Sequence, residues 1–217
     1  MVIAALGVFI VSFDALLVRL AAVDASTVSF YRGLFMGLSM LMLWQLKGVR
    51  SSKPVSTKEL LIFTLIVMLS AMSTALFVFS VKYTAAANTV VLLATASFFA
   101  AIFTYFLIKE PIQKSTLAAI VISFLGVFIV FGSSFSIGSN WIGDLLGLAL
   151  AVVMGLELTL LRKYPHFPKL LLIALSGFVV AFVMLFASDS LLDISAQTLF
   201  WLMVMGLVQM PLAMYLI

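Results

Sequence analysis

An acid and an arginine stand in two neighbouring apolar stretches of the sequence, Asp14 in the first and Arg32 in the second. At a rise of about 1.5 Å per residue, each lies an estimated ~5 to 6 Å outward of the middle of its stretch, so the two side chains can meet at one depth. If these stretches cross a bilayer, an ionised group there costs at least ~2.5–3.5 kcal/mol, which suggests pairing, water access or function. Two interpretations follow: an ion pair that locks two helices, or a binding site for a solute or a proton.

A second carboxylate, Glu157, repeats this pattern without its cation. A shift of 143 residues aligns the segment from Asp14 to Arg19 with the segment from Glu157 to Arg162, and it places Leu175 where Arg32 would stand. Glu157 could therefore bind and release protons, meet a cationic solute or reach an arginine elsewhere. The plainer alternative is a hydrogen bond between helices.

Neutral polar residues form two further stripes. One stripe holds Thr84, Asn88 and Thr95, and the other holds Ser70, Ser73 and Thr74. At about 100° per residue each set falls on one face of a helix, which predicts that it faces protein or water rather than lipid. Each stripe either lines a cavity or bonds neighbouring helices. Gln209 is the approximate repeat counterpart of Ser70. The predicted site for a solute or coupling ion is Asp14, Arg32, Ser70, Thr74, Asn88, Thr95, Glu157 and Gln209.

The elements that carry these residues are predicted to be helices that cross a bilayer. Hydrophobic residues make up 65% of the 217 positions and charged residues 9%, against about half and a quarter in soluble domains. Continuous apolar runs of about 20 residues predict spanning helices, because hydrocarbon offers backbone amides no water. We expect an all-α fold with spans near 1–20, 26–46, 59–81, 85–108, 115–132, 142–162, 169–187 and 197–217.

The basic residues predict the orientation of these spans. They gather in alternate loops: Lys47, Arg50, Lys53 and Lys58, then Lys109 and Lys114, then Arg162, Lys163 and Lys169. Cytoplasmic loops carry an excess of Lys and Arg, so the N-terminus is predicted to be cytoplasmic, in the cell (inner) membrane. The net charge of +4 reflects this bias rather than nucleic-acid binding. Without cysteine and with His166 alone, we expect no metal and no cofactor.

The 143-residue shift also predicts an internal repeat, in which Gly33 corresponds to Gly177, one residue out of step. Five spans separate the copies, and this odd number inverts the second copy in the membrane, as in many secondary transporters. The predicted domains are a first five-helix repeat at 1–132, an extracytoplasmic linker at 133–141 and a second repeat of three helices at 142–217.

Small residues predict the helix contacts. Gly33 and Gly37 form one packing seam, and a longer stripe consists of Gly143, Gly147, Ala151 and Gly155. Such residues let transmembrane helices approach closely. Pro211 could kink the last span.

Several segments resemble a known family. Tyr31-Arg32-Gly33, following a polar start at Ser26, looks like the second helix of EamA-type transporters of the drug/metabolite transporter superfamily. The stretch from Lys82 to Thr89, Lys109-Glu110-Pro111-Ile112 and the span with Gly126-Val127 resemble that family's third to fifth helices. The resemblance implies ten helices in two inverted five-helix repeats that move small organic solutes or metabolites, often outward.

Three departures from the family pattern keep the substrate open. Ser97 stands where proline is common, Lys109 replaces the usual glycine, and Phe13-Asp14 replaces the usual Trp-Gly. Two helices expected of the family do not follow, which a truncated chain would explain.

These observations predict a secondary transporter working by alternating access on a small organic solute or metabolite, with an amino-acid-like solute and export as options. Arg32 would recognise an anionic part of the solute, and Glu157 or Asp14 would carry protons. The partners are the solute and the lipid bilayer; a proton, a counter-solute and a homodimer are left open. A membrane enzyme acting on lipids would need clustered acids for magnesium, and no two acids lie within a few residues in one span. A non-transporting membrane subunit remains the other alternative.

Overall fold

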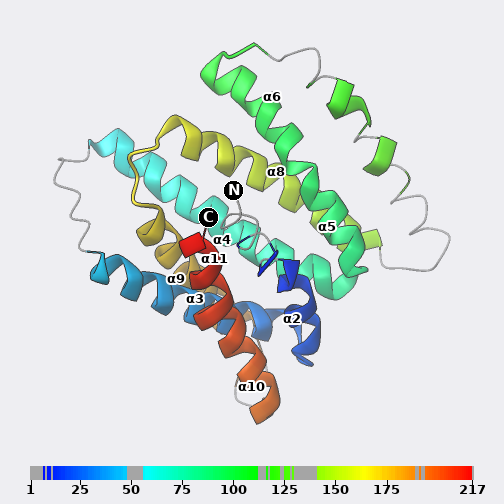
Figure 1. The fold of residues 1–217 in the computed structure, drawn as a ribbon, viewed down its shortest axis with the longest axis vertical. Coiled ribbons are helices and arrows are strands. Elements are labelled where there is room, and N and C mark those ends of the chain that lie inside the picture. Colours follow the sequence, from blue (N-terminus) through cyan, green and yellow to red (C-terminus); the bar gives the residue numbers. More distant parts are fainter. Residues whose placement is uncertain are drawn as a thin grey trace. The chain divides into compact units, whose positions relative to one another are not determined.

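The computed structural model describes residues 7, 9–10, 12–47, 56–111, 116, 118–122, 125–127, 129, 141–188, 191 and 194–216. Within these ranges every element of regular secondary structure is a helix (Figure 1), which confirms the all-α class. Five helical segments are long and apolar enough to cross a membrane: Thr57–Tyr83, Ala86–Ile108, Trp141–Lys163, Lys169–Ala187 and Ala196–Ala213.

The helices follow the predicted spans in chain order. They are α2 (Asp14–Leu20), α3 (Ala25–Leu46), α4 (Thr57–Tyr83), α5 (Ala86–Ala94), α6 (Ala96–Ile108), α8 (Trp141–Lys163), α9 (Lys169–Ala187), α10 (Ala196–Met203), the π-helix η1 (Val204–Gln209) and α11 (Met210–Leu216). Of the span predicted at 115–132 the structure describes residues 116, 118–122, 125–127 and 129, all of them helical, whereas the linker predicted at 133–141 lies outside the described residues except for its last position.

Three predicted spans depart locally from regular α-helix. Thr95 forms a turn between α5 and α6, where its hydroxyl donates to the Leu92 carbonyl over 2.6 Å. Phe13 forms a turn immediately before α2. In the last span η1 precedes α11, and the N–H of Met210 reaches back five residues to the Met205 carbonyl. Because Pro211 has no N–H to continue the α-helical ladder, the irregular turn falls just before it.

The chain divides into two compact units. Unit 1 comprises residues 1–78 and 167–217, and unit 2 comprises residues 79–166. The helix α4 contributes its first part to unit 1 and its last residues to unit 2. The predicted division into two repeats is a different partition, and it stays a prediction.

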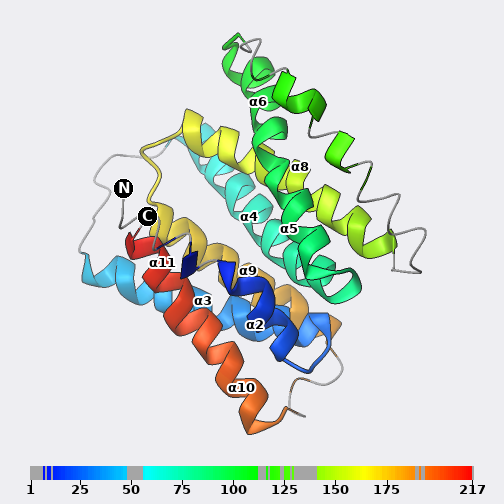
Figure 2. The same ribbon diagram turned by 45° about the vertical axis from the view of Figure 1, so that its right-hand side comes forward.

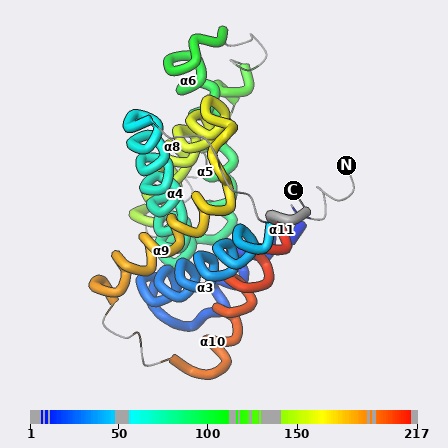
Figure 3. Tube along the Cα trace, turned by 90° about the vertical axis from the view of Figure 1, so that its left-hand side faces the viewer, coloured from blue at the N-terminus to red at the C-terminus, as the bar shows by residue number. Residues whose placement is uncertain are grey.

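In unit 1, α3 and α9 lie side by side (Figures 1 and 3) and meet at a pair of glycines. A Cβ on Gly33 would lie 2.7 Å from the Gly177 carbonyl oxygen, so neither position leaves room for a side chain. The helices run antiparallel, since Thr27 near the start of α3 hydrogen-bonds Ser188 after the end of α9 over 2.7 Å. The packing seam predicted at Gly33 is therefore confirmed.

In unit 2, α8 packs against α5 and α6 through its small residues (Figure 2). A Cβ on Gly155 would lie 2.6 Å from Phe99 Cβ, and one on Gly143 would lie 2.5 Å from the Thr84 nitrogen. The glycine stripe predicted for this span is therefore also a packing seam.

Candidate functional site

Asp14 and Arg32 form a buried ion pair in unit 1. Arg32 Nη2 donates to Asp14 Oδ2 over 2.7 Å, and the two side chains are only 5% (Arg32) and 7% (Asp14) exposed. Asp14 is the first residue of α2 and Arg32 lies within α3, so the predicted meeting of the two charges is observed. The ring centroid of Phe77 on α4 lies 5.0 Å from Arg32 Cζ, and this cation–π contact covers the guanidinium.

This ion pair uses only part of its hydrogen-bonding capacity. Asp14 Oδ1 and Arg32 Nε and Nη1 are buried without a hydrogen-bond partner in the described structure. An unsatisfied buried polar group costs about 1–3 kcal/mol, and more when it is charged. A half-satisfied buried pair is a poor structural lock, so the geometry favours a site that a further polar group completes.

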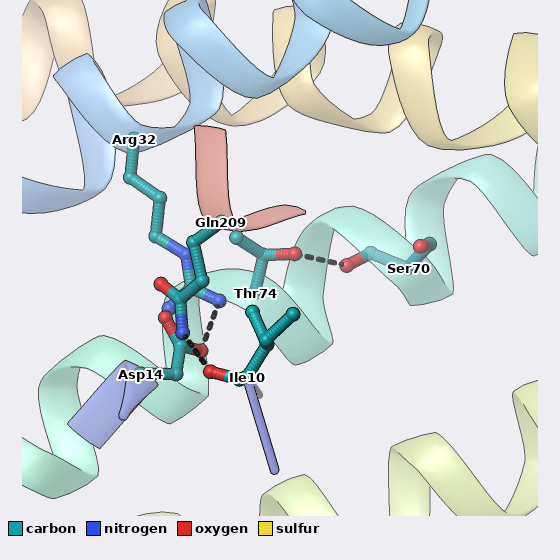
Figure 4. Close-up of polar contacts among 6 residues, drawn as sticks. All are labelled: Ile10, Asp14, Arg32, Ser70, Thr74 and Gln209. Carbon is teal, nitrogen blue, oxygen red and sulfur yellow. Dashed lines mark hydrogen bonds and ion pairs between the residues drawn. The ribbon is translucent and has the colours of Figure 1, made fainter. Parts of the chain in front are cut away.

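Gln209 meets this pair from the last span. Its Nε2 donates to the Ile10 carbonyl over 2.9 Å, while its Oε1 is buried without a partner in the described part of the chain. The Ile10 carbonyl also accepts the N–H of Phe13 over 3.3 Å, at the turn that precedes α2. The turn before α2 and the π-helix of the last span are therefore joined by a hydrogen bond beside the ion pair (Figure 4).

Close contacts with α3 fix the position of the π-helix. Ser39 Oγ donates to the Gly206 carbonyl over 2.9 Å. A side chain on Gly206 would overlap Phe35, so only glycine lets η1 approach α3 this closely. These contacts hold Gln209, the last residue of η1, beside the ion pair. Single π-turns within α-helices occur frequently at functional sites.

Ser70 and Thr74 lie one turn apart on α4 (Figure 4). Thr74 Oγ1 donates to the Ser70 carbonyl over 3.0 Å, a bond within the helix. Ser70 is buried and Thr74 half-buried. Unit 1 thus holds five of the eight predicted site residues: Asp14, Arg32, Ser70, Thr74 and Gln209.

The other three predicted residues, Asn88, Thr95 and Glu157, lie in unit 2. The Asn88 amide donates to a carboxylate of α8 that is described below, whereas the Thr95 hydroxyl bonds to its own helix. Glu157 is half-buried on α8 and has an interaction partner in the structure. The lack of an arginine at its repeat position therefore does not leave Glu157 free.

Sequence reasoning missed Asp144. This residue is fully buried in the first turn of α8, and its Oδ1 accepts hydrogen bonds from Thr84 and Asn88 over 2.6 and 3.2 Å. An acid in the first turn of a helix is common because the helix dipole favours it there, so the pattern carried little signal. Its position within an uncharged surrounding segment was the available hint.

Comparisons with known proteins agree with the membrane fold. The EamA-like transporter family matches residues 1–132, more than half of the chain. An "Uncharacterized transporter" of Clostridium kluyveri is 34% identical over 84 residues, which cover 38% of this chain and 27% of that protein. The match thus spans about a quarter of the relative's length, and no solved structure matches the chain. The chain belongs to the EamA-like transporter family and is a multi-pass membrane protein.

Proposed function

We propose that this protein is a secondary transporter that moves a small organic solute across the membrane by alternating access. Family membership and the apolar helices support transport across a bilayer. The observation that carries the proposal is the half-satisfied ion pair between Asp14 and Arg32, which is buried beside the turn before α2 and the π-helix of the last span. A solute would complete its missing hydrogen bonds.

The unpartnered atoms indicate the class of solute. Arg32 offers N–H donors from Nε and Nη1, whereas Asp14 Oδ1 and Gln209 Oε1 offer acceptors. The ion pair itself has no net charge, so a solute with a net charge would bring an uncompensated charge to membrane depth. We expect a solute without net charge that has an anionic group for Arg32 and an N–H or O–H group for the acceptors. An amino-acid-like zwitterion meets both conditions.

The glycine contact between α3 and α9 supports two inverted halves. A Cβ placed on Gly33 would lie 2.7 Å from the Gly177 carbonyl oxygen, and a Cβ placed on Gly177 would lie 2.6 Å from the Gly33 carbonyl oxygen. One turn further on, the Cβ position of Gly33 lies 3.2 Å from the nitrogen of Ala181. The Cβ position of Gly177 likewise lies 2.8 Å from the nitrogen of Gly37. Reciprocal contacts arise where two antiparallel helices pack about a local two-fold axis, and this is also the relation expected between corresponding helices of an inverted repeat. Rocking of one half against the other would then expose the site alternately.

Orientation, direction and coupling complete the proposal. The basic loops favour an N-terminus in the cytoplasm, in the cytoplasmic membrane, and the family resemblance favours export of the solute. Asp14 or Glu157 would carry protons if the transport is proton-coupled. These two carboxylates are the only predicted proton carriers, so their neutral isosteres test the coupling.

Flux measurements in liposomes test this function. Purified protein should move at least one zwitterionic solute from a panel that also contains anionic and cationic solutes, and empty liposomes should not. If transport is proton-coupled, Asp14→Asn or Glu157→Gln should lose its pH dependence. Full, pH-independent flux by both variants would exclude the proton role, and no flux from folded protein would favour the non-transporting subunit.

A further inference from the structure

Asp144 in unit 2 is a buried carboxylate with both of its hydrogen bonds on one oxygen. Its exposed fraction is 0%. Thr84 Oγ1 and Asn88 Nδ2 donate to Oδ1, whereas Oδ2 is buried and has no hydrogen-bond partner among the residues that the structure describes. The carboxylate is therefore held by two neutral donors and is incomplete on its other side.

The packing around Asp144 fixes the carboxylate in this position. The Ser80 hydroxyl donates to the Gly143 carbonyl over 2.9 Å and lies 2.8 Å from Thr89 Oγ1. The Cβ position of Gly143 meets the backbone of Thr84, so the first turn of α8 lies directly on the corner between α4 and α5. Oxygen atoms of Ser80, Thr89 and Gly143 are consequently bonded to one another beside the acid, and Thr84 and Asn88 bond the carboxylate itself.

Neither of the ion pairs Asp14–Arg32 and Glu110–Arg162 involves Asp144. The helices α5 and α6 contain no charged residue, and neither does the segment 131–140 that precedes α8. On α4 the nearest cation in sequence is Lys82, which has an interaction partner, and on α8 Arg162 and Lys163 lie at the opposite end of the helix. Glu157, the other acid of α8, would only add negative charge.

A buried carboxylate is stable when a cation pairs with it or a metal ion binds to it. We propose that Asp144 binds a monovalent cation, and that this cation is Na⁺. One positive charge balances the single carboxylate, and its unpartnered Oδ2 is a hard oxygen ligand of the kind that such an ion prefers. A divalent ion would leave excess charge and usually takes several carboxylates, whereas the described residues hold no cluster of three metal-binding side chains.

This site rests on contacts within unit 2 alone, whereas its use in coupling rests on the proposed function. If transport occurs, Na⁺ bound at Asp144 could supply the gradient that drives it. Binding can be measured on the purified protein before any solute is known. A failure of the cation site is therefore distinguishable from a failure of transport.

Thermal unfolding of the purified full chain in detergent tests the site. NaCl should replace choline chloride at constant ionic strength, so that general screening does not change. A bound ion stabilises the folded state by mass action, so we expect the unfolding temperature to rise with Na⁺ and then saturate. Asp144→Asn keeps an oxygen that accepts from Thr84 but removes the charge. It should weaken the apparent Na⁺ affinity at least about tenfold, which corresponds to about 1.4 kcal/mol.

Glu110→Gln is the matched control, because Glu110 is an exposed acid of the same unit and should leave the Na⁺ response unchanged. An Asp144→Asn protein with an unchanged Na⁺ response would overturn the proposal. Should that variant fail to fold, equilibrium binding of radioactive sodium to the wild-type chain decides, and no saturable binding overturns the site. Stabilisation by protons or divalent ions without a response to Na⁺ would overturn the assignment of the ion.

Discussion

Unit 1 buries a carboxylate together with an arginine, whereas unit 2 buries a carboxylate between a threonine and an asparagine. Both acids keep one oxygen without a partner in the described chain. The pair in unit 1 is neutral as a whole and also has unused donors, so it suits a solute that carries both donors and acceptors. The acid in unit 2 is held by two neutral donors and, in the proposal above, suits a cation. The two kinds of site therefore differ in which donor and acceptor atoms lack a partner, and not in burial alone.

Removing Arg32 should have the largest effect on stability. Arg32→Gln leaves the Asp14 charge buried without its cation, and breaking a buried pair in this way costs about 3–5 kcal/mol. Thermal unfolding of the purified variant measures the loss. The double variant Asp14→Asn and Arg32→Gln removes both charges and should recover most of the stability. A single variant as stable as the wild type would show that the pair is accessible to water.

The two glycine seams should differ in their tolerance of a methyl group. At Gly33 the nearest neighbour is the backbone carbonyl of Gly177, which cannot move aside, so Gly33→Ala should cost about 1–3 kcal/mol through overpacking. At Gly147 the nearest atoms are a methyl group of Leu92 and the hydrogen-bonded Ser80 hydroxyl, both at 2.9 Å, and side-chain ends can shift more readily than a backbone carbonyl. Gly147→Ala should therefore be closer to neutral, helped by the better helix propensity of alanine. Equal losses of unfolding temperature would contradict this difference.

Asp144→Asn should affect stability far less than Arg32→Gln when sodium is absent. The substitution removes a charge that has no cation, so we expect a change within about 1 kcal/mol, and stabilisation is the favoured sign. Unfolding in choline chloride measures it. A loss as large as that of Arg32→Gln would mean that the charge of Asp144 is required for folding, and the contrast between the two units would fail.

The smallest effect is expected at the ion pair between Arg162 and Glu110 in unit 2. The Nη2–Oε2 distance is 2.7 Å, but the side chains are 61% (Arg162) and 48% (Glu110) exposed. Surface pairs contribute about 0–1 kcal/mol and are screened by salt. Glu110→Gln should therefore lower the unfolding temperature slightly at low ionic strength and not at high ionic strength. A large, salt-independent loss would show that this pair is effectively buried.

Much of the fold and part of the site could be predicted from residue type and spacing. Counting residues along two apolar spans placed Asp14 and Arg32 at one depth, and small residues at helical spacing located both glycine seams. The interruptions at Phe13 and Thr95 could not be found in this way, because apolar runs through these residues carry no local break signal. Pro211 did predict an irregular turn in the last span. The direction of the Gln209 side chain, however, is set by contacts with α3 and Ile10, which the sequence does not show. Asp144 was missed because its donors come from other helices.

In the proposed function, the ion pair of Asp14 and Arg32 binds the solute and does not merely join two helices. The most direct test compares flux of the transported solute through the wild type and the double variant Asp14→Asn and Arg32→Gln at matched folding. Lost charge-assisted hydrogen bonds cost about 1.5–3 kcal/mol, so we expect flux to fall at least about tenfold in the folded double variant. Wild-type flux through that variant would contradict the claim and would reduce the pair to a structural contact.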